Sequence, residues 1–286
     1  MFLKRLIVNA DDFGRHVHIN EAVEKGAAEG ILRSATLMAG GRAFEDAVSR
    51  VRRLPQLGLG VHFTLVDGFP ILPPEEIPSL IDQNGVFFPD YHTFSKHYAR
   101  GGVRLEEVRA ELAAQLGKLK AAGLAVDHAD SHQHMHVLPG IVEVIIGLCR
   151  EAGIPALRAP FAPLFAGSFG GVRQFVGRVG LSLLARNAAR LAHQAGLFVP
   201  GHFAGIVAGE AVGEAELAAV PENLREGTTE IMMHPGTMNE AIARDCGWQH
   251  DFEAELAAIL SPKAAKLLEE EGIEVVNFQA LGGSSS

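Results

Sequence analysis

The chain has 286 residues, of which 48% are hydrophobic and 21% are charged, and this composition argues against a disordered or fibrous protein. Its formal net charge of −9 argues against nucleic acid as the main partner, because nucleic-acid-binding proteins usually present a basic face. The N-terminus lacks the pattern of a signal peptide, and no apolar run approaches the roughly 18 residues of a spanning helix, so we expect a cytoplasmic protein.

Short apolar, β-branched runs alternate with longer helical patterns along the chain, which predicts parallel strands covered by helices. Several predicted helices end in a glycine that leads into the next apolar run, as expected of a helix C-terminus. The predicted strands are residues 5–10, 35–39, 59–65, 125–129, 156–158, 203–207, 230–233 and 274–278. The predicted helices are residues 20–30, 42–54, 105–122, 140–152, 172–194, 214–224 and 262–271.

This alternation, without an intervening linker, predicts a single α/β domain over residues 1–280 with the form of a (β/α) barrel resembling a TIM barrel. In such a barrel the C-terminal ends of the strands converge on one face, so polar residues that follow different strands meet there. Residues 66–102 and 160–200 are predicted to be lid-like insertions near the site. Residues 281–286 are expected to form a flexible tail.

Two adjacent aspartates, Asp11 and Asp12, follow the first predicted strand in the motif NADDFG. Neighbouring carboxylates repel each other and are costly to bury without a cation. One of them can therefore bind a metal ion while the other faces substrate. The alternative interpretation is a surface loop in which Asp12 caps the following helix.

A histidine cluster extends from His128 to His136 around Asp130, and its density predicts a metal site. Histidines two apart share a face on a strand, and histidines four apart share one on a helix. The spacing does not decide whether His132, His134 or His136 binds the metal. A solvated histidine-rich loop is the alternative.

Two further histidines stand in apolar surroundings. A lone histidine such as His62, in GVHFTL, is more often a core residue, and only its place near a strand end makes it a candidate ligand. His234, in MMHPG, is delivered by a strand into a Pro-Gly turn, which suits a general acid.

An aspartate and two histidines with open coordination positions suit zinc, with magnesium, manganese or cobalt as alternatives. Such an ion can activate water and polarise a carbonyl group. With the second aspartate as base and a separate histidine as acid, the parts predict metal-assisted amide hydrolysis.

The motifs NADDFG, GVHFTL, DSHQHMH and MMHPG, in this order, resemble those of the YdjC family of carbohydrate deacetylases over nearly the whole chain. That family includes the chitooligosaccharide deacetylase. The resemblance implies an irregular (β/α) barrel of the polysaccharide deacetylase type with one divalent metal ion. By motif position it implies Asp11 as the general base, Asp12, His62 and His132 as metal ligands, and His234 as the catalytic acid. The residues expected to bind substrate or to support the ligands are His134, His136, Asp130 and Arg158.

Residues 152–209 contain no Asp or Glu but five arginines among many apolar residues. This pattern is typical of a segment that lies on an anionic membrane surface, although a barrel helix with a basic outer face would share it. The sequence is also similar to the hopanoid-biosynthesis-associated YdjC-like proteins, which implies an N-acetylglucosaminyl hopanoid as substrate. We therefore expect a lipid-linked amino sugar and peripheral contact with the inner membrane through residues 160–200, with a soluble chitooligosaccharide as the alternative.

Two other functions use similar residues. A metallophosphoesterase also has Asp and His ligands, but the sequence shows no second ligand set of the kind that a two-metal site needs. A catalytically silent sugar- or lipid-binding protein would not require Asp11 or His234. The sequence is compatible with a homo-oligomer as well as with a monomer.

Overall fold

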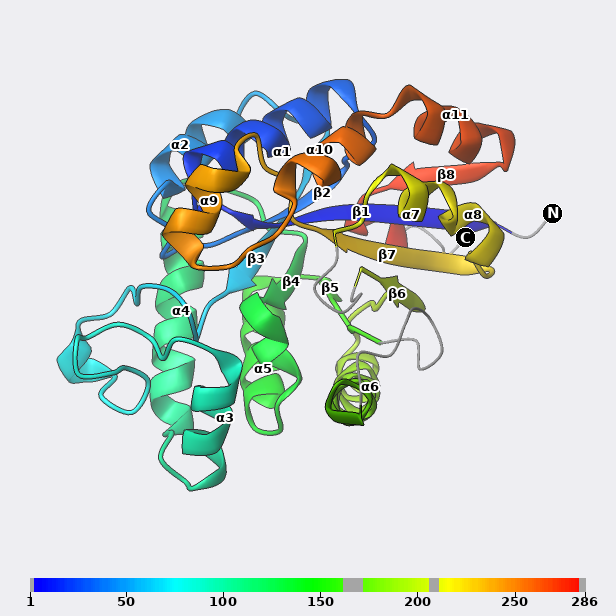
Figure 1. Ribbon diagram of the computed structural model, residues 1–286. Coiled ribbons are helices and arrows are strands. Elements are labelled where there is room, and N and C mark those ends of the chain that lie inside the picture. Colours follow the sequence, from blue (N-terminus) through cyan, green and yellow to red (C-terminus); the bar gives the residue numbers. More distant parts are fainter. Residues whose placement is uncertain (1–2, 162–171, 206–210, 283–286) are drawn as a thin grey trace.

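The computed structural model describes residues 3–161, 172–205 and 211–282, and it shows a parallel sheet with helices around it (Figure 1). Every predicted strand overlaps an observed one, which confirms the α/β class. The strands are β1 (Lys4–Phe13), β2 (Ser34–Leu37), β3 (Gly58–Phe63), β4 (His128–Ser131), β5 (Ala156–Leu157), β6 (His202–Ala204), β7 (Gly227–Met233) and β8 (Ile273–Val276).

The sheet is centred on β1 and has the strand order β5-β4-β3-β2-β1-β7-β6. β8 pairs with the first half of β1, and β2 pairs with its second half, so these two strands share one edge of β1. All of these pairs are parallel. Among the described residues, β5 and β6 do not pair with each other, so the strands form a curled half-barrel whose C-terminal ends face the same side.

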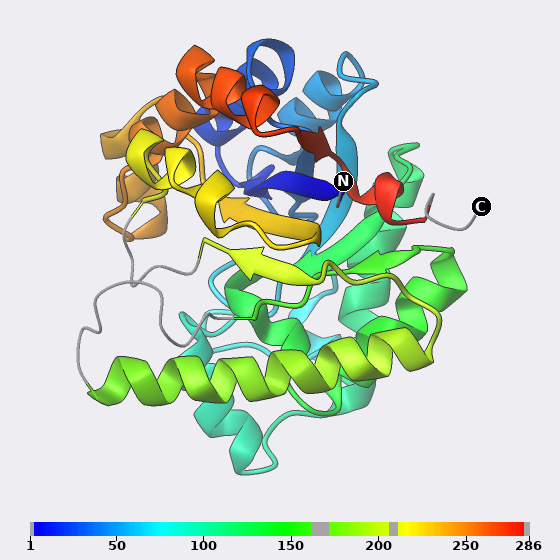
Figure 2. The ribbon, with the colours of Figure 1, turned by 90° about the vertical axis from the view of Figure 1, so that its right-hand side faces the viewer.

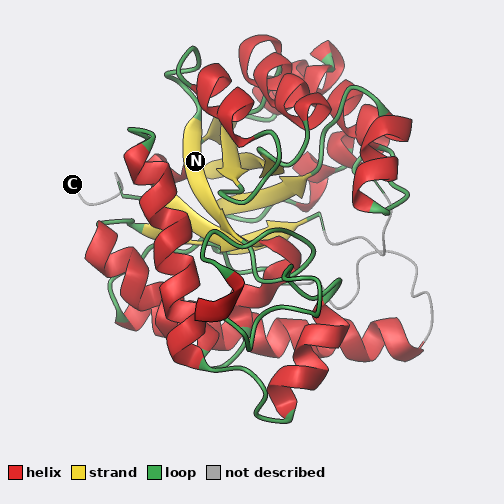
Figure 3. Ribbon diagram, turned by 90° about the vertical axis from the view of Figure 1, so that its left-hand side faces the viewer, coloured by secondary structure: helices red, strands yellow, loops and turns green. Residues whose placement is uncertain are grey.

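The central strand is buried almost along its entire length, as expected of a parallel sheet that is covered on both faces. Figure 3 shows the strands surrounded by helices. The helices that match predictions are α1 (Val17–Glu29), α2 (Phe44–Val51), α4 (Leu105–Ala121), α5 (Ile141–Ala152), α6 (Val172–Gln194) and α11 (Pro262–Glu270).

The prediction of one continuous helix over residues 214–224 is wrong. The structure has two short helices there, α7 (Glu214–Ala218) and α8 (Val220–Asn223). Pro221 lies in the first turn of α8, where its missing N–H is tolerated, whereas the interior of a longer helix would be disrupted by it.

Three helices were not predicted: α3 (Tyr91–Ala99), α9 (Asn239–Cys246) and α10 (Phe252–Leu260). α3 buries only Phe94 and therefore has little apolar periodicity. α10 did carry a readable signal, because Asp251 caps its N-terminus by accepting a hydrogen bond from the backbone N–H of Ala254. Short 3₁₀ helices complete the elements: η1 (Pro74–Glu76), η2 (His132–Val137) and η3 (Phe278–Leu281).

The regions predicted as insertions and tail differ in how far the structure describes them. Residues 66–102 contain η1 and α3 and lie beside α4 (Figure 1). Within residues 160–200, the segment 162–171 lies outside the described residues, and α6 runs along one side of the molecule (Figure 2). Leu281 is the last residue of η3 rather than part of a tail, and residues 283–286 lie outside the described residues. No helix in the described ranges is long and apolar enough to cross a membrane.

Candidate metal centre and active site

The two adjacent aspartates lie within β1, not after it as predicted. The pairing between β1 and β2 slips between Ala10 and Phe13, which marks an irregularity of the β-bulge type, and the strand continues to Phe13. Asp12 has a φ of 60°, a left-handed conformation that aspartate adopts more readily than most residues. Such a bulge redirects side chains, and both carboxylates are buried, with Asp11 2% and Asp12 3% exposed.

Three side chains from separate strand ends converge at this bulge. The Oδ1 atom of Asp12 lies 3.2 Å from Nε2 of His62 on β3 and 2.8 Å from Nδ1 of His132, which directly follows β4. The three potential ligand atoms all lie within 4.8 Å of one another. The structure thus brings together the residues that the sequence placed at the ends of three strands.

The donor atoms of this cluster fit a divalent cation. Asp12 Oδ1 and His62 Nε2 are buried, and neither atom has a hydrogen bond of good geometry, although Oδ1 lies 3.2 Å from that nitrogen and 2.8 Å from His132 Nδ1. Leaving such atoms without a partner is costly, and one cation between them would satisfy both. A carboxylate and two imidazoles suit zinc and several other divalent ions.

His62 is held in one orientation by the strand next to it. It is paired in register with Asp130 of β4, and its Nδ1 atom lies 2.7 Å from Asp130 Oδ1 and 3.1 Å from Thr36 Oγ1. A carboxylate bound to the far nitrogen of a ligand histidine fixes the ring and leaves the other nitrogen for the metal. Asp130 therefore supports a candidate ligand.

His132 is supported from the opposite side by two residues that the sequence analysis missed. Its Nε2 atom lies 3.2 Å from Nη1 of Arg15 and 3.3 Å from Oδ2 of Asp67, and these two residues form an ion pair at 3.0 Å. Arg15 stands 117 positions away from His132 in the sequence. A single charged residue in a loop gives no pattern from which such a contact could be predicted.

The histidines that follow His132 have separate environments. Backbone angles with positive φ at Gln133 and His134 interrupt η2, so the regular strand or helix spacing considered for this cluster does not exist. His136 is fully buried, and its ring nitrogens contact Ser131 Oγ at 2.7 Å and the backbone oxygen of Arg158 at 3.2 Å. His136 thus holds the backbone in place.

His134 lies close enough to Asp11, His62 and His234 to feel their charges, and its buried Nδ1 atom has no hydrogen-bond partner. Burial, aided by the positive charge of Arg158, lowers the pKa of His134 to about 3. The imidazole is therefore neutral under ordinary conditions and can accept or donate one hydrogen bond.

Arg158 directly follows β5 and is completely buried at the centre of a carboxylate cluster. Its Nη1 and Nη2 atoms donate to the two oxygens of Asp11, each at 2.6 Å. Nη1 also lies 2.7 Å from Asp130 Oδ2, and Nε donates to Glu230 Oε1 at 2.7 Å. Arg158 was predicted to belong to a basic, apolar segment on the protein surface. The structure corrects this, because Arg158 is buried and binds carboxylates inside the half-barrel.

This arrangement sets the protonation of two carboxyl groups. Burial alone would raise the pKa of Asp11, but the charge and hydrogen bonds of Arg158 outweigh it and hold that pKa well below its usual range. Burial, only partly offset by Arg158, together with repulsion from Asp130 raises the pKa of Glu230 to about 7. Asp11 is therefore ionised at neutral pH.

His234 directly follows β7 and is half-buried beside the cluster of aspartates. Its backbone N–H donates to Glu255 Oε2, and its ring packs edge-on against Trp248 and His250, with ring centroids 5.1 and 5.7 Å away. Burial lowers the pKa of His234, opposed by the negative charges of Asp11 and Glu255. The turn therefore holds the imidazole firmly while leaving it partly accessible.

His234, His250 and Glu255 also have ligand atoms within 4.8 Å of one another. Both oxygens of Glu255 are already in use. Oε1 accepts from the backbone N–H of Val212 at 2.9 Å and lies 3.0 Å from His250 Nε2, and Oε2 accepts from the N–H of His234. We therefore interpret Glu255 and His250 as residues that hold His234 in position, rather than as ligands of a second metal ion.

Comparisons with known proteins agree with this architecture. A family model described as YdjC-like protein matches residues 5–270. The carbohydrate deacetylase of Brevibacillus brevis is 31% identical over 97% of this chain and 100% of that protein. The carbohydrate deacetylase of Thermoanaerobacter pseudethanolicus is 25% identical over 98% of this chain and 100% of its own. Among solved structures, an Enterococcus faecalis protein provisionally named for cellobiose-phosphate cleavage superimposes with a TM-score of 0.80 at 26% identity, covering 98% of this chain and 99% of that one.

Proposed function

Because the chain belongs to the YdjC-like protein family, we propose that it is a metal-dependent N-deacetylase that removes the acetyl group from an N-acetylglucosamine unit. The observation that carries this proposal is the pair of buried, unpartnered ligand atoms on Asp12 and His62, with His132 beside them. The names of the relatives, carbohydrate deacetylases, supply the reaction class.

In this proposal Asp12, His62 and His132 hold one divalent ion, with zinc as the first choice. Such an ion supplies a Lewis acid for the amide carbonyl and lowers the pKa of the attacking water. Asp11 accepts the proton of that water. The carboxylate of Asp11 is kept in orientation by hydrogen bonds from Arg158, at 2.6 Å, and from Asn9, at 2.8 Å.

His234 completes the reaction as the general acid. Water adds its oxygen to the acetyl carbon, the carbon–nitrogen bond breaks, and the leaving nitrogen takes a proton from the imidazole. Acetate and a free amino sugar are the products. The backbone bond from His234 to Glu255 and the packing against Trp248 keep the ring in place for this transfer.

The proposed substrate carries its amino sugar on a lipid, as in an N-acetylglucosaminyl hopanoid. Support comes from the outer face of α6, where Leu183 is 59% exposed and is followed on the same face by the exposed residues Arg186 and Arg190. This mixture suits peripheral contact with an anionic membrane. A chitooligosaccharide is the alternative substrate, and a non-catalytic sugar- or lipid-binding protein is the alternative function.

The experiment that tests the proposal measures acetate release by the metal-loaded protein from N-acetylglucosaminyl hopanoid in vesicles and from N,N′-diacetylchitobiose. Acetate from the hopanoid supports the lipid-linked substrate. Acetate from the disaccharide alone removes the lipid from the proposal and keeps the deacetylase. Acetate from neither substrate, with bound metal confirmed, contradicts the deacetylase.

Replacing His234 with Asn is expected to lower acetate release by about 10²–10⁴-fold, the usual contribution of a general acid. The wild-type rate should fall as the pH rises through the pKa of His234, which burial holds below the ordinary histidine value, and the variant should lack this fall. His193→Asn is the matched control, because His193 is an exposed histidine on α6. Metal content is measured alongside, and a His234 variant that loses its metal would show that this histidine is a ligand instead.

A further inference from the structure

A line of buried polar side chains leads from Asp11 toward the N-terminal ends of the strands. Asn9, which precedes Asp11 on β1, donates from Nδ2 to Asp11 Oδ1 at 2.8 Å and to Thr36 Oγ1 at 3.3 Å. At the other end of the amide, Asn9 Oδ1 lies 3.2 Å from Nε2 of His128, the first residue of β4. Asn9, Thr36 and His128 are fully buried. Polar atoms at this depth are costly without partners, so each of these bonds constrains the next.

The amide of Asn9 has one favourable orientation in this arrangement. Its nitrogen faces the Asp11 carboxylate, which accepts hydrogen bonds and cannot donate them. Turning the amide over would bring two acceptor oxygens together. Asn9 Oδ1 therefore faces His128 and needs a hydrogen from Nε2 of that ring. A donor at this nitrogen fixes the amide that in turn holds Asp11.

His128 is itself held at its edge and on its face. Its Nδ1 atom lies 2.6 Å from Asp127 Oδ1, and Asp127 Oδ2 accepts from Gln279 Nε2 at 3.1 Å. The ring of Phe278 stacks on the imidazole with centroids 3.8 Å apart and planes 8° apart. A carboxylate faces one ring nitrogen and the amide oxygen of Asn9 faces the other. Each nitrogen therefore carries a hydrogen, as in an imidazolium paired with Asp127.

A glycine leaves the space that this ring needs. β2 and β3 lie between β4 and β1 in the sheet, so His128 reaches Asn9 across the inside of the half-barrel. Gly60 of β3 is paired in register with His128, and a Cβ atom at Gly60 would lie 2.5 Å from His128 Nε2. A side chain at this position would displace the ring from Asn9.

We propose that His128, held by Asp127, is a positioning residue for Asp11 and acts through Asn9. It fixes the amide whose nitrogen donates to Asp11 Oδ1, and so it holds the carboxylate in the orientation that takes the proton of the attacking water. This inference rests on the proposed function. It gives the first histidine of the cluster a task other than binding metal.

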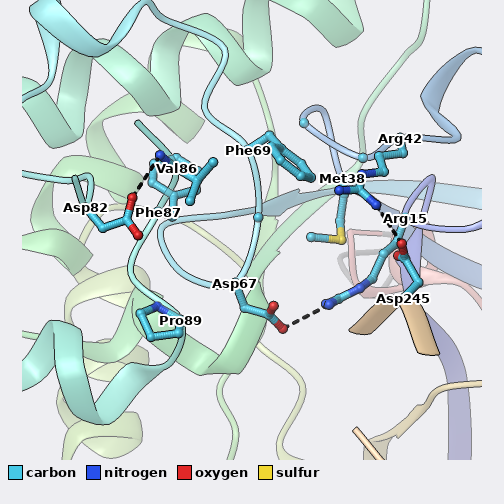
Figure 4. Close-up of a pocket in the computed structure, with 13 residues that line it drawn as sticks. Arg15, Met38, Arg42, Asp67, Phe69, Asp82, Val86, Phe87, Pro89 and Asp245 are labelled. Atoms are coloured by element: carbon cyan, nitrogen blue, oxygen red, sulfur yellow. Dashed lines mark hydrogen bonds and ion pairs between the residues drawn. The ribbon is translucent and has the colours of Figure 1, made fainter. Parts of the chain in front are cut away.

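The ligand histidines have supports of their own, which in the case of His132 are Arg15 and Asp67. Figure 4 shows the ion pair between Arg15 and Asp67 at the wall of a cavity of about 280 Å³. Replacing His128 leaves this ion pair in place. We therefore expect such variants to change the rate of acetate release and to keep the metal content of the wild type.

The test compares kcat for acetate release in the wild type, His128→Leu and His128→Gln, with either substrate that the wild type turns over. Leucine removes the donor to Asn9, so kcat should fall about tenfold with little change in KM, because the base is less well oriented. Glutamine can place an amide nitrogen near the position of Nε2 and should recover most of the rate. An unchanged kcat in His128→Leu overturns the inference.

Ser34→Ala is the matched control. Ser34 is fully buried and its Oγ atom lies 3.4 Å from His128 Nε2, but its removal leaves the bond from His128 to Asn9 in place. This variant should keep the kcat of the wild type. A fall as large as that in His128→Leu would show that any polar loss in this layer lowers the rate, which contradicts a specific role for His128.

A double-mutant cycle separates positioning from a general loss of structure. Adding His128→Leu to Asp11→Asn should lower the residual rate no further, because the base that His128 positions is already absent. A role in folding alone would lower the rate by the same factor in both backgrounds. That result would overturn the inference.

A measurement without turnover separates this inference from the proposed function. In isotope-labelled protein, the side-chain amide hydrogens of Asn9, assigned by their absence from Asn9→Ser, should exchange with solvent about tenfold faster in His128→Leu than in the wild type or His128→Gln. If the wild type releases no acetate but this difference is found, the deacetylase proposal fails and the hydrogen-bond network stands. If acetate is released and the exchange rates are equal, the positioning role fails alone.

Discussion

Replacing Asp11 with Asn is expected to reduce acetate release by about 10²–10⁴-fold, the usual contribution of a general base, while one metal ion stays bound. A carboxamide cannot accept the proton of the attacking water, and Asn keeps the shape of the side chain and one acceptor for Arg158. The metal ligands lie on other residues, with Asp12 Oδ1 as the shared atom of the cluster. Steady-state kinetics and elemental analysis of the purified variant measure the two effects.

The matched control for this variant is Asp12→Asn. It should lose both the metal and the activity, because its carboxylate is the only acidic ligand in the group with His62 and His132. If Asp11→Asn loses its metal and Asp12→Asn keeps it, the roles of the two aspartates are reversed.

Replacing Arg158 with Met is expected to lower the free energy of unfolding by about 3–5 kcal/mol, the usual cost of leaving a buried ion pair without one partner. Arg158 is fully buried, and its guanidinium binds Asp11, Asp130 and Glu230. Methionine fills similar space without a charge, so three carboxylates would lose their shared cation. The stability of Arg158→Lys should lie between that of the wild type and that of Arg158→Met, because one ammonium group cannot replace the planar set of donors on a guanidinium. Chemical denaturation provides the measurement.

Glu230→Gln is the control within the same cluster, and its loss of stability should be much smaller because a carboxamide oxygen can still accept a hydrogen bond from Arg158 Nε.

The raised pKa of Glu230, about 7 against 4.5 for an ordinary glutamate, also determines how the stability of the protein depends on pH. Between these values the folded protein binds more protons than the unfolded chain, so wild-type stability should fall as the pH rises from about 4.5 to about 7, relative to Glu230→Gln. An Arg158→Met protein as stable as the wild type would contradict the role given to this cluster.

The positions of the strands were predictable because each is a short apolar run that ends in polar residues. That pattern also placed the two aspartates, His62 and the histidine cluster near one side of the sheet, since the ends of parallel strands meet there. The choice of Asp12, His62 and His132 as metal ligands came only from the resemblance. The bulge in β1 was not predictable. It depends on the register with β2, to which the NADDFG motif gives no clue, and it decides that both aspartates are buried at the centre.

Contacts between residues far apart in the sequence explain most of what was missed. Arg158 and Asp11 are 147 positions apart, and the sequence placed this arginine near the site only by resemblance. Glu255 lies on a helix that was not predicted, and it still holds the turn at His234. A single charged residue has no periodicity, so its partner becomes visible only when the chain is folded.

The central claim is tested most directly by titrating metal-free protein with zinc while acetate release from N,N′-diacetylchitobiose and from N-acetylglucosaminyl hopanoid is measured. The account predicts that acetate release from at least one of them rises with bound zinc and levels off at about one ion per chain, and that Asp12→Asn shows no rise. Protein that binds one ion through Asp12, His62 and His132 and releases acetate from neither substrate would contradict it.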